Sequence, residues 1–106
     1  MWAGHLHGQL VVTGALATIA GSIHDEEVKS MRTAPAVRGQ SLGMAMLNHL
    51  AADARDRGIE RLWLETGSMA FFAAARALYR RSGFTECGPF GSYRADPNST
   101  FMTSIL

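Results

Sequence analysis

The sequence predicts an α/β (α+β) fold, in which helices pack on a mixed, mostly antiparallel sheet with a central βαβ unit. Three observations support it. Two strand-like segments adjoin across a short turn, which favours an antiparallel hairpin. An amphipathic helix then separates the second segment from another alternating one, as in a βαβ unit with a right-handed crossover. The chain has 106 residues, of which 47% are hydrophobic, which suits one domain with its own core.

The beginning of the chain, residues 1–8, shows no clear period. His5 and His7 would share one face of a strand, but two histidines alone are a weak signal of a metal site. We expect an exposed or expression-related end here. Residues 9–19 are rich in Val, Leu, Ile and Thr and predict a strand. Gly14 within it marks a bulge or a close contact.

Turn-forming residues at 21–25 lead into a second strand, predicted for residues 27–33 and ended by Pro35. The two strands should pair as an antiparallel hairpin, because the connection between them is short. Strict alternation places every second side chain of a strand on the same face. One face of the second strand would then carry Glu27, Lys29, Met31 and Thr33.

The next segment, residues 42–57, has the period of an amphipathic helix, and Gly58 supplies its C-terminal stop. The predicted apolar stripe consists of Gly43, Met46, Leu47, Leu50 and Ala54. Residues 59–66 then alternate, with Leu62 and Leu64 opposite Trp63 and Glu65. This strand should run parallel to the strand that precedes the helix.

The last third of the chain predicts a helix over residues 69–82, capped by Ser68 and stopped by Gly83. A short strand at 84–87, a turn-rich loop at 88–99 and a final strand at 101–106 complete an order of β-β-α-β-α-β-β. The domain is predicted to be a single unit, because no linker or repeat interrupts it.

Charge and cysteine content exclude several function classes. The net charge is +1, from 10 Lys and Arg against 9 Asp and Glu, which favours neither nucleic acid nor a membrane surface as partner. The single cysteine, Cys87, allows no disulfide within the chain and fits a reducing compartment, so we expect a cytoplasmic protein. Cys87 as a nucleophile would need a base, and the sequence places none beside it.

A candidate phosphate site lies between the second strand and the first helix. Residues 37–43 are rich in small and basic residues, and the first turn of a helix leaves N–H groups unpaired at the positive end of the helix dipole. Arg38 adds a full positive charge, so the segment suits a phosphorylated ligand. A nucleotide binder of another class is disfavoured, because the chain has neither a Walker-type lysine nor a G-x-G-x-x-G run.

Two motifs carry a resemblance to a known family. The run Arg38-Gly39-Gln40-Ser41-Leu42-Gly43 resembles the Q/R-x-x-G-x-G/A pyrophosphate loop of the GNAT N-acetyltransferases. The run ARALYRRSGF, residues 75–84, is similar to the family's A-x-x-L-Y-x-x-x-G-F. Together, in this order, the motifs identify the chain as similar to a small bacterial subgroup of that family over roughly residues 10–106.

The resemblance implies direct transfer of an acetyl group from acetyl-CoA to a primary amine of a small molecule, with no metal. It implies that Tyr79 is the acid that protonates the leaving thiolate, which suits a phenol with a pKa of about 10. Glu27 is the candidate base, directly or through a water. Glu26 would replace it if the register differed by one residue, and Glu65 is a rival at the end of the parallel strand.

The resemblance also implies the cosubstrate contacts. The strand before the loop would hold the pantetheine arm in a splayed gap, with the oxyanion donor a backbone N–H near Met31. The implied contacts are Met31, Arg32, Thr33, Arg38, Gly39, Gln40, Ser41, Leu42, Gly43, Met44 and Arg76. Ser41 stands where the family has a glycine, and Phe72 where many members have an asparagine. Residues 88–99 would line the acceptor site, with Tyr93 and Asn98 orienting the amine.

Family members usually place a strand and two helices before the hairpin, and these elements are expected to be absent from residues 1–106. Either the chain is a truncated form, or a second subunit covers an exposed sheet edge. A homodimer is therefore expected, also because of the terminal strand at 101–106. The alternative to an active enzyme is a non-catalytic acyl-CoA-binding module or an inactive truncated acetyltransferase.

Overall fold

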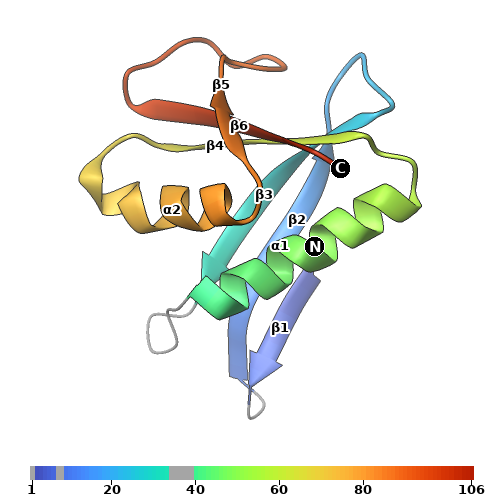
Figure 1. The fold of residues 1–106 in the computed structure, drawn as a ribbon, viewed down its shortest axis with the longest axis vertical. Helices are drawn as coiled ribbons and strands as arrows, with labels where there is room; N and C mark the ends of the chain where they lie inside the picture. Colours follow the sequence, from blue (N-terminus) through green and yellow to red (C-terminus); the bar gives the residue numbers. More distant parts are fainter. Residues whose placement is uncertain (1, 7–8, 34–39) are drawn as a thin grey trace.

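The computed structural model describes residues 2–6, 9–33 and 40–106 and forms one six-stranded sheet in the order β1-β2-β3-β4-β6-β5 (Figure 1). The parallel pair is β3 with β4, and the other neighbours are antiparallel. The predicted fold class is therefore confirmed. The strands are β1 (Trp2–Leu6), β2 (Gln9–Thr18), β3 (Asp25–Thr33), β4 (Arg61–Gly67), β5 (Thr85–Cys87) and β6 (Ser99–Ile105).

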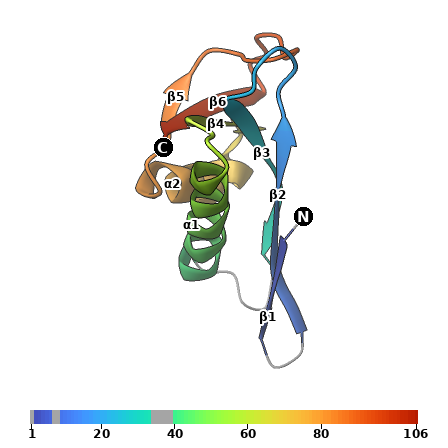
Figure 2. The ribbon, with the colours of Figure 1, turned by 90° about the vertical axis from the view of Figure 1, so that its right-hand side faces the viewer.

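The helices are α1 (Gln40–Asp56), the short 3₁₀ helix η2 (Ala70–Phe72) and α2 (Ala73–Arg81). Figure 2 shows α1 and α2 on the same face of the sheet. The β3–α1–β4 segment is the predicted βαβ unit, although α1 begins two residues earlier than predicted. Gly58 ends α1 with a φ of 86°, and the Ile59 amide donates to the Ala54 carbonyl at 2.9 Å, as a C-terminal glycine motif requires.

The core lies between the sheet and α1. The predicted stripe of α1 is buried, and the largest fully buried side chains are Leu50, Leu62, Leu64 and Met102. Gly43 belongs to the stripe because α2 approaches it closely: a Cβ at this position would lie 2.6 Å from Leu78 Cδ2. The glycine thus allows α1 and α2 to pack against each other on the same face of the sheet.

The beginning of the chain differs from the prediction. Residues 2–6 form β1, which pairs with β2 from Trp2 opposite Gly14 to Leu6 opposite Gln9. The Trp2 ring also packs edge-on against His49 of α1, with ring centroids 5.4 Å apart. The expectation of an exposed or expression-related end was therefore wrong, and the order has one strand more than predicted.

The last strand, predicted at 101–106, is present as β6 and lies inside the sheet. β6 pairs with β4 on one side and with β5 on the other, and the edge strands are β1 and β5. The terminal strand therefore gives no support to a covering subunit. Ser68 does not cap the helix that follows: its hydroxyl lies 2.7 Å from the Thr100 hydroxyl, and η2 intervenes before α2.

A β-bulge interrupts the pairing of β2 with β3. Thr13 pairs with Arg32 and Ala15 with Lys29, so two residues of β3 lie opposite Gly14. Ser30 within the bulge adopts a φ of 57°, a left-handed conformation that costs a non-glycine residue about 1 kcal/mol. The bulge changes the alternation, so Met31 packs against the core on the α1 face and not, as predicted, on the face of Glu27.

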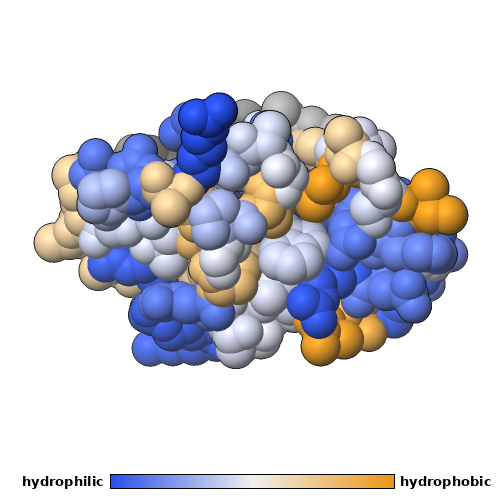
Figure 3. All heavy atoms as spheres, turned by 90° about the horizontal axis from the view of Figure 1, so that it is seen from above, coloured by the Kyte–Doolittle hydropathy of each residue, from blue (hydrophilic) through white to orange (hydrophobic). Residues whose placement is uncertain are grey.

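The surface seen from above carries its hydrophobic residues as separate groups between hydrophilic ones (Figure 3). Across the described residues, no helix combines the length and the apolar character needed to cross a membrane. Among the side chains that the structure describes, the exposed large apolar ones are Ile23, Met69, Phe71 and Ile105.

Asp25 holds the start of β3 and gives the fold a pH-dependent component. Its carboxylate accepts hydrogen bonds from Ser22 Oγ at 2.5 Å and Trp63 Nε1 at 2.8 Å, and the Ser22 bond above all lowers the pKa of Asp25 below its ordinary 3.8. The ionised carboxylate therefore stabilises the fold above the unfolded-state pKa, and this stabilisation is lost as the pH falls through the lower folded-state value.

Asp25→Asn is expected to lower the free energy of unfolding by about 1 to 2 kcal/mol at pH 7, because an amide accepts these bonds less well. The difference from the wild type should shrink as the pH falls below 4. Urea unfolding at several pH values measures both, with Asp56→Asn at an exposed position as the control. A difference that stays constant with pH would contradict the role of the charge.

Candidate functional site

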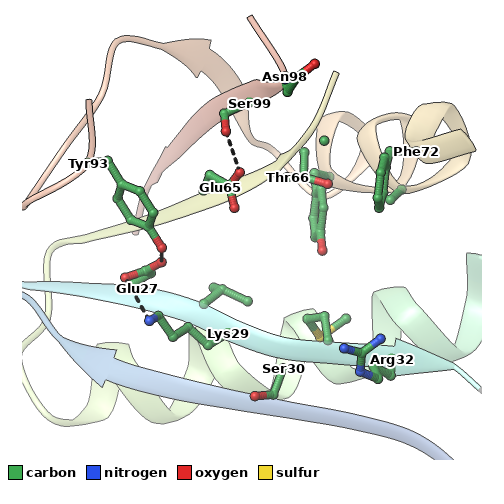
Figure 4. A pocket seen from close by; sticks show the side chains of 15 residues that line it. Glu27, Lys29, Ser30, Arg32, Glu65, Thr66, Phe72, Tyr93, Asn98 and Ser99 are labelled. Carbon is green, nitrogen blue, oxygen red and sulfur yellow. Dashed lines mark hydrogen bonds and ion pairs between the residues drawn. The ribbon is translucent and has the colours of Figure 1, made fainter. Parts of the chain in front are cut away.

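The site begins where β3 and β4 separate. The two strands pair only from Asp25 opposite Arg61 to Glu27 opposite Trp63, after which β3 stays with β2 and β4 stays with β6 (Figure 1). A cleft of about 700 Å³ opens beyond this contact (Figure 4). This is the splayed gap that the resemblance implied. Its lining residues are Glu27, Val28, Lys29, Ser30, Met31, Arg32, Glu65, Thr66, Gly67, Phe72, Ala75, Tyr79, Tyr93, Asn98 and Ser99.

Both predicted catalytic residues line this cleft, from different elements. Glu27 comes from β3 and Tyr79 from α2, on opposite sides of the gap between the strands. Met31 and Arg32, predicted to contact the cosubstrate, line it as well. The sequence order therefore placed these side chains in one space, although nothing in the structure tests their roles.

Glu27 is a buried carboxylate, with 8% of the residue exposed. Its Oε2 accepts a hydrogen bond from the Tyr93 hydroxyl at 2.6 Å, and its Oε1 lies 3.9 Å from Lys29 Nζ (Figure 4). Glu26 points to the other face of β3, where Arg57 of the α1 end donates two hydrogen bonds to it, at 2.6 and 2.9 Å. Of the two neighbouring carboxylates, Glu27 is thus the one that faces the cleft.

Glu65 is the second carboxylate of the cleft and comes from β4. The Ser99 hydroxyl donates to its Oε2 at 2.7 Å (Figure 4). The sequence left it open whether Glu27 or Glu65 is the base, and both side chains line the cleft in the structure. The two differ in what holds them, because a phenol contacts Glu27 and an aliphatic hydroxyl contacts Glu65.

Tyr79 is buried, with 8% of the residue exposed, and its ring packs edge-on against Phe84 at 6.0 Å. Burial raises the pKa of Tyr79 above the ordinary 10.0, so the phenol keeps its proton at neutral pH. Within the described part of the chain, no hydrogen bond joins its hydroxyl to another residue. The hydroxyl is therefore a proton donor available to a bound molecule.

Tyr93 is the residue whose place sequence reasoning missed, since the sequence named it only as a possible contact of the amine. It comes from the loop between β5 and β6, and its ring packs on Phe90 at 5.1 Å and on Phe101 at 5.5 Å. Burial first, then the hydrogen bond to Glu27 and the charges of Glu27 and Glu65, raise its pKa to about 12. Tyr93 is thus a protonated donor.

The predicted pyrophosphate loop lies mostly outside the described residues. This holds for Arg38 and Gly39, and for the side chains of Thr33, Gln40 and Ser41. Within α1, Leu42 packs against the core, Gly43 faces Leu78 and Met44 is half-buried. The contribution of these residues to phosphate binding stays a prediction.

Arg76 and Phe72 have partners within the chain itself. Arg76 Nη1 donates to the carbonyls of Gly67 at 2.6 Å and Met69 at 2.9 Å, which holds the turn between β4 and η2. Its predicted contact with the cosubstrate stays untested. The Phe72 ring lies against Gly67, where a Cβ would collide with it, and lines the cleft.

Two other kinds of site, a metal-ion site and a nucleophilic cysteine, can be compared with the residues that the structure describes. No three of their His, Cys, Asp and Glu side chains gather closely enough to hold a metal ion, and His7 lies outside this set. Cys87 is half-buried on β5, and burial raises the pKa of its thiol, with Arg61 opposing the shift. A raised pKa disfavours the thiolate that a nucleophile needs.

Comparison with known proteins agrees with this geometry. A family model described as "Acetyltransferase (GNAT) family" matches residues 4–84. The chain is 43% identical over 105 residues to the uncharacterized N-acetyltransferase YsnE of Bacillus subtilis. The alignment covers 99% of this chain and 68% of the relative. It is 41% identical over 99 residues to the IAA acetyltransferase of Azospirillum brasilense. That alignment covers 93% of this chain and 63% of the relative.

Among solved structures, the "putative acyl-CoA N-acyltransferase" from Klebsiella pneumoniae superposes with a TM-score of 0.83 at 38% identity, covering 93% of this chain and 66% of that one. The chain thus spans about two thirds of the length of these relatives. The family uses acetyl-CoA or another acyl-CoA as the donor. The match over residues 4–84 and the identity to the relatives show that the chain belongs to the acetyltransferase (GNAT) family.

Proposed function

We propose that the protein transfers an acetyl group from acetyl-CoA to a primary amine of a small molecule by direct attack. The observation that carries this proposal is the cleft between β3 and β4, in which the buried Glu27 carboxylate and the buried Tyr79 phenol face the same space. One group can accept a proton and the other can donate one, which is what an acyl transfer to an amine needs.

The cleft fits the extended arm of an acyl-CoA. Over Lys29–Arg32, β3 has no ladder partner on the β4 side, so its backbone groups can pair with a ligand that adds as a strand. We place the oxyanion donor at a backbone N–H near Met31, where the bulge at Ser30 interrupts regular pairing with β2. When bound, acetyl-CoA supplies the thioester that the amine attacks.

The phosphates would lie at the start of α1. The contacts proposed there are the amides and side chains of Arg38, Gly39, Gln40, Ser41, Leu42, Gly43 and Met44, with Met31, Arg32 and Thr33 along the arm and Arg76 beside η2. A helix N-terminus with an adjacent arginine is a favourable anion site.

The proton movements follow from the two buried groups. Glu27 takes a proton from the ammonium of the acceptor, directly or through a water, so that the neutral amine attacks. Tyr79 gives the proton of its hydroxyl to the sulfur that leaves. The second carboxylate, Glu65, lines the same cleft, together with the basic side chains of Lys29 and Arg32.

Two further proposals concern the environment of the protein. A homodimer is consistent with the edge strands β1 and β5, which can each pair with another chain. A cytoplasmic location is consistent with the one free cysteine of the sequence.

The experiment is a thiol-release assay with purified protein, acetyl-CoA and a panel of primary amines, in which mass spectrometry identifies the acetylated product. We expect release that depends on the amine, and none with carboxylic acids that lack an amino group. Release without an amine would indicate hydrolysis and contradict the proposal. Calorimetric binding of CoA without any turnover would indicate a non-catalytic acyl-CoA-binding module.

A further inference from the structure

Tyr93 is a half-buried polar side chain that the proton movements above do not use. Its hydroxyl donates to Glu27 Oε2 at 2.6 Å, across 66 residues of sequence. The loop that carries it has turn chemistry of its own, since the Asn98 amide donates to Asp96 Oδ1 at 2.8 Å. Tyr93 belongs to the loop between β5 and β6, and its side chain points toward Glu27 of β3 (Figure 4).

The ring of Tyr93 is fixed by an aromatic cluster. Phe90 and Phe101 contact it, and they are 9% and 5% exposed. Trp63 of β4 packs on Phe90 at 5.4 Å, so the cluster rests on the strand that forms the far wall of the cleft. A hydroxyl on a ring held in this way has a defined position, because a tyrosine has only two side-chain torsions and both are constrained by packing.

The other oxygen of Glu27 is held more weakly. Lys29 Nζ lies 3.9 Å from Oε1, beyond a hydrogen bond, and the lysine side chain is 51% exposed. The Tyr93 bond therefore fixes the carboxylate through Oε2, whereas Oε1 has no hydrogen bond from the residues that the structure describes. A glutamate without such a bond would sample several rotamers, and a displaced base loses rate because proton transfer needs hydrogen-bond reach.

We propose that Tyr93 is a positioning residue, whose hydroxyl holds the Glu27 carboxylate so that one oxygen stays available for the proton of the acceptor amine. This inference rests on the proposed function. Tyr93 does not itself take the proton, since its pKa of about 12 keeps it protonated throughout the usual assay range. Its effect on the rate passes entirely through Glu27.

A double-mutant cycle tests the coupling. Tyr93→Phe should lower kcat about tenfold with the KM for acetyl-CoA unchanged, because the ring and its packing remain. Glu27→Gln should lower kcat further, and the double variant should be no slower than Glu27→Gln alone. Losses that multiply in the double variant, or a Tyr93→Phe variant with full activity, would overturn the proposal. So would a Glu27→Gln variant with full activity.

The matched control is Thr103→Val, which also removes one hydroxyl that donates a hydrogen bond, here to the Leu62 carbonyl at 2.9 Å and outside the cleft. Its kcat should equal that of the wild type. An equal fall in kcat for Thr103→Val and Tyr93→Phe would mean that lost stability alone explains both, and would overturn the positioning role.

Crystal structures of the wild type and of Tyr93→Phe decide the question without any turnover. The wild type should show one orientation of the Glu27 carboxylate, bonded to Tyr93, and the variant should show a rotated carboxylate or several orientations. An unmoved carboxylate in Tyr93→Phe would overturn the proposal. If no amine of the panel is acetylated, the proposed function fails, while these two structures still test the hold on Glu27.

Discussion

Tyr79→Phe is expected to lower kcat about a hundredfold or more, while the protein stays folded. The phenol is the proposed proton donor to the leaving sulfur, and phenylalanine keeps the ring against Phe84 but has no proton to give. The KM for acetyl-CoA should change little, because the shape of the cleft is retained. Steady-state kinetics with thiol detection measure both parameters.

The pH dependence gives a second signature of Tyr79. Since burial raises its pKa above 10.0, the wild type should lose activity only above that pH, as the acid loses its proton. Tyr79→Phe should lack this alkaline limb. The chain has two tyrosines, so Tyr93→Phe completes the comparison and should retain the limb. A Tyr79→Phe variant with unchanged kcat would contradict its role as the acid.

Arg57→Ala is expected to have the largest effect on stability, at about 3 kcal/mol of the free energy of unfolding. Glu26 is 7% exposed, and the two hydrogen bonds from Arg57 are its partners in the structure. Removal of the guanidinium leaves a carboxylate in a largely apolar layer. We expect the lower end of the usual range for a broken buried pair, because the Arg57 side chain is 43% exposed.

Arg80 supplies a matched control for Arg57. Its Nη2 lies 2.6 Å from Glu86 Oε1, the same distance as between Arg57 and Glu26, but both partners are more than half exposed. Arg80→Ala should therefore cost less than about 1 kcal/mol. Urea unfolding measures both variants. If Arg57→Ala and Arg80→Ala lose the same free energy of unfolding, the burial of Glu26 does not determine the cost. If the double variant Arg57→Ala/Glu26→Gln recovers stability, the cost comes from the buried charge of Glu26.

The helices and the inner strands could be predicted because their signals are local. Periodicity placed α1 and its buried stripe, and Gly58 and Gly83 marked the helix ends through positive φ. β1 was missed because residues 2–6 show no period, and pairing with β2 creates that strand. The orientation of Met31 was missed because the bulge at Ser30 depends on pairing with the partner strand β2. The alternation of residues along one strand carries no information about that pairing.

The candidate site was predictable only in part. Glu27 and Tyr79 converge because the order of strands and helices brings their elements together, and motifs had marked both. The groups that hold the carboxylates come from the segment between β5 and the start of β6: Tyr93 holds Glu27, and Ser99 holds Glu65. Tyr93 is positioned by packing on Phe90 and Phe101, and Ser99 by the pairing of β6 with β4. Neither depends on a local sequence pattern.

The brief contact between β3 and β4 makes the sheet two half-sheets joined over three residue pairs. If the donor adds as a strand between them, as proposed, it becomes a structural member as well as a reactant. By mass action, a ligand at 100 times its Kd adds about 2.7 kcal/mol to the free energy of unfolding. We then expect the thermal stability of this protein to rise with the concentration of its donor, before any turnover occurs.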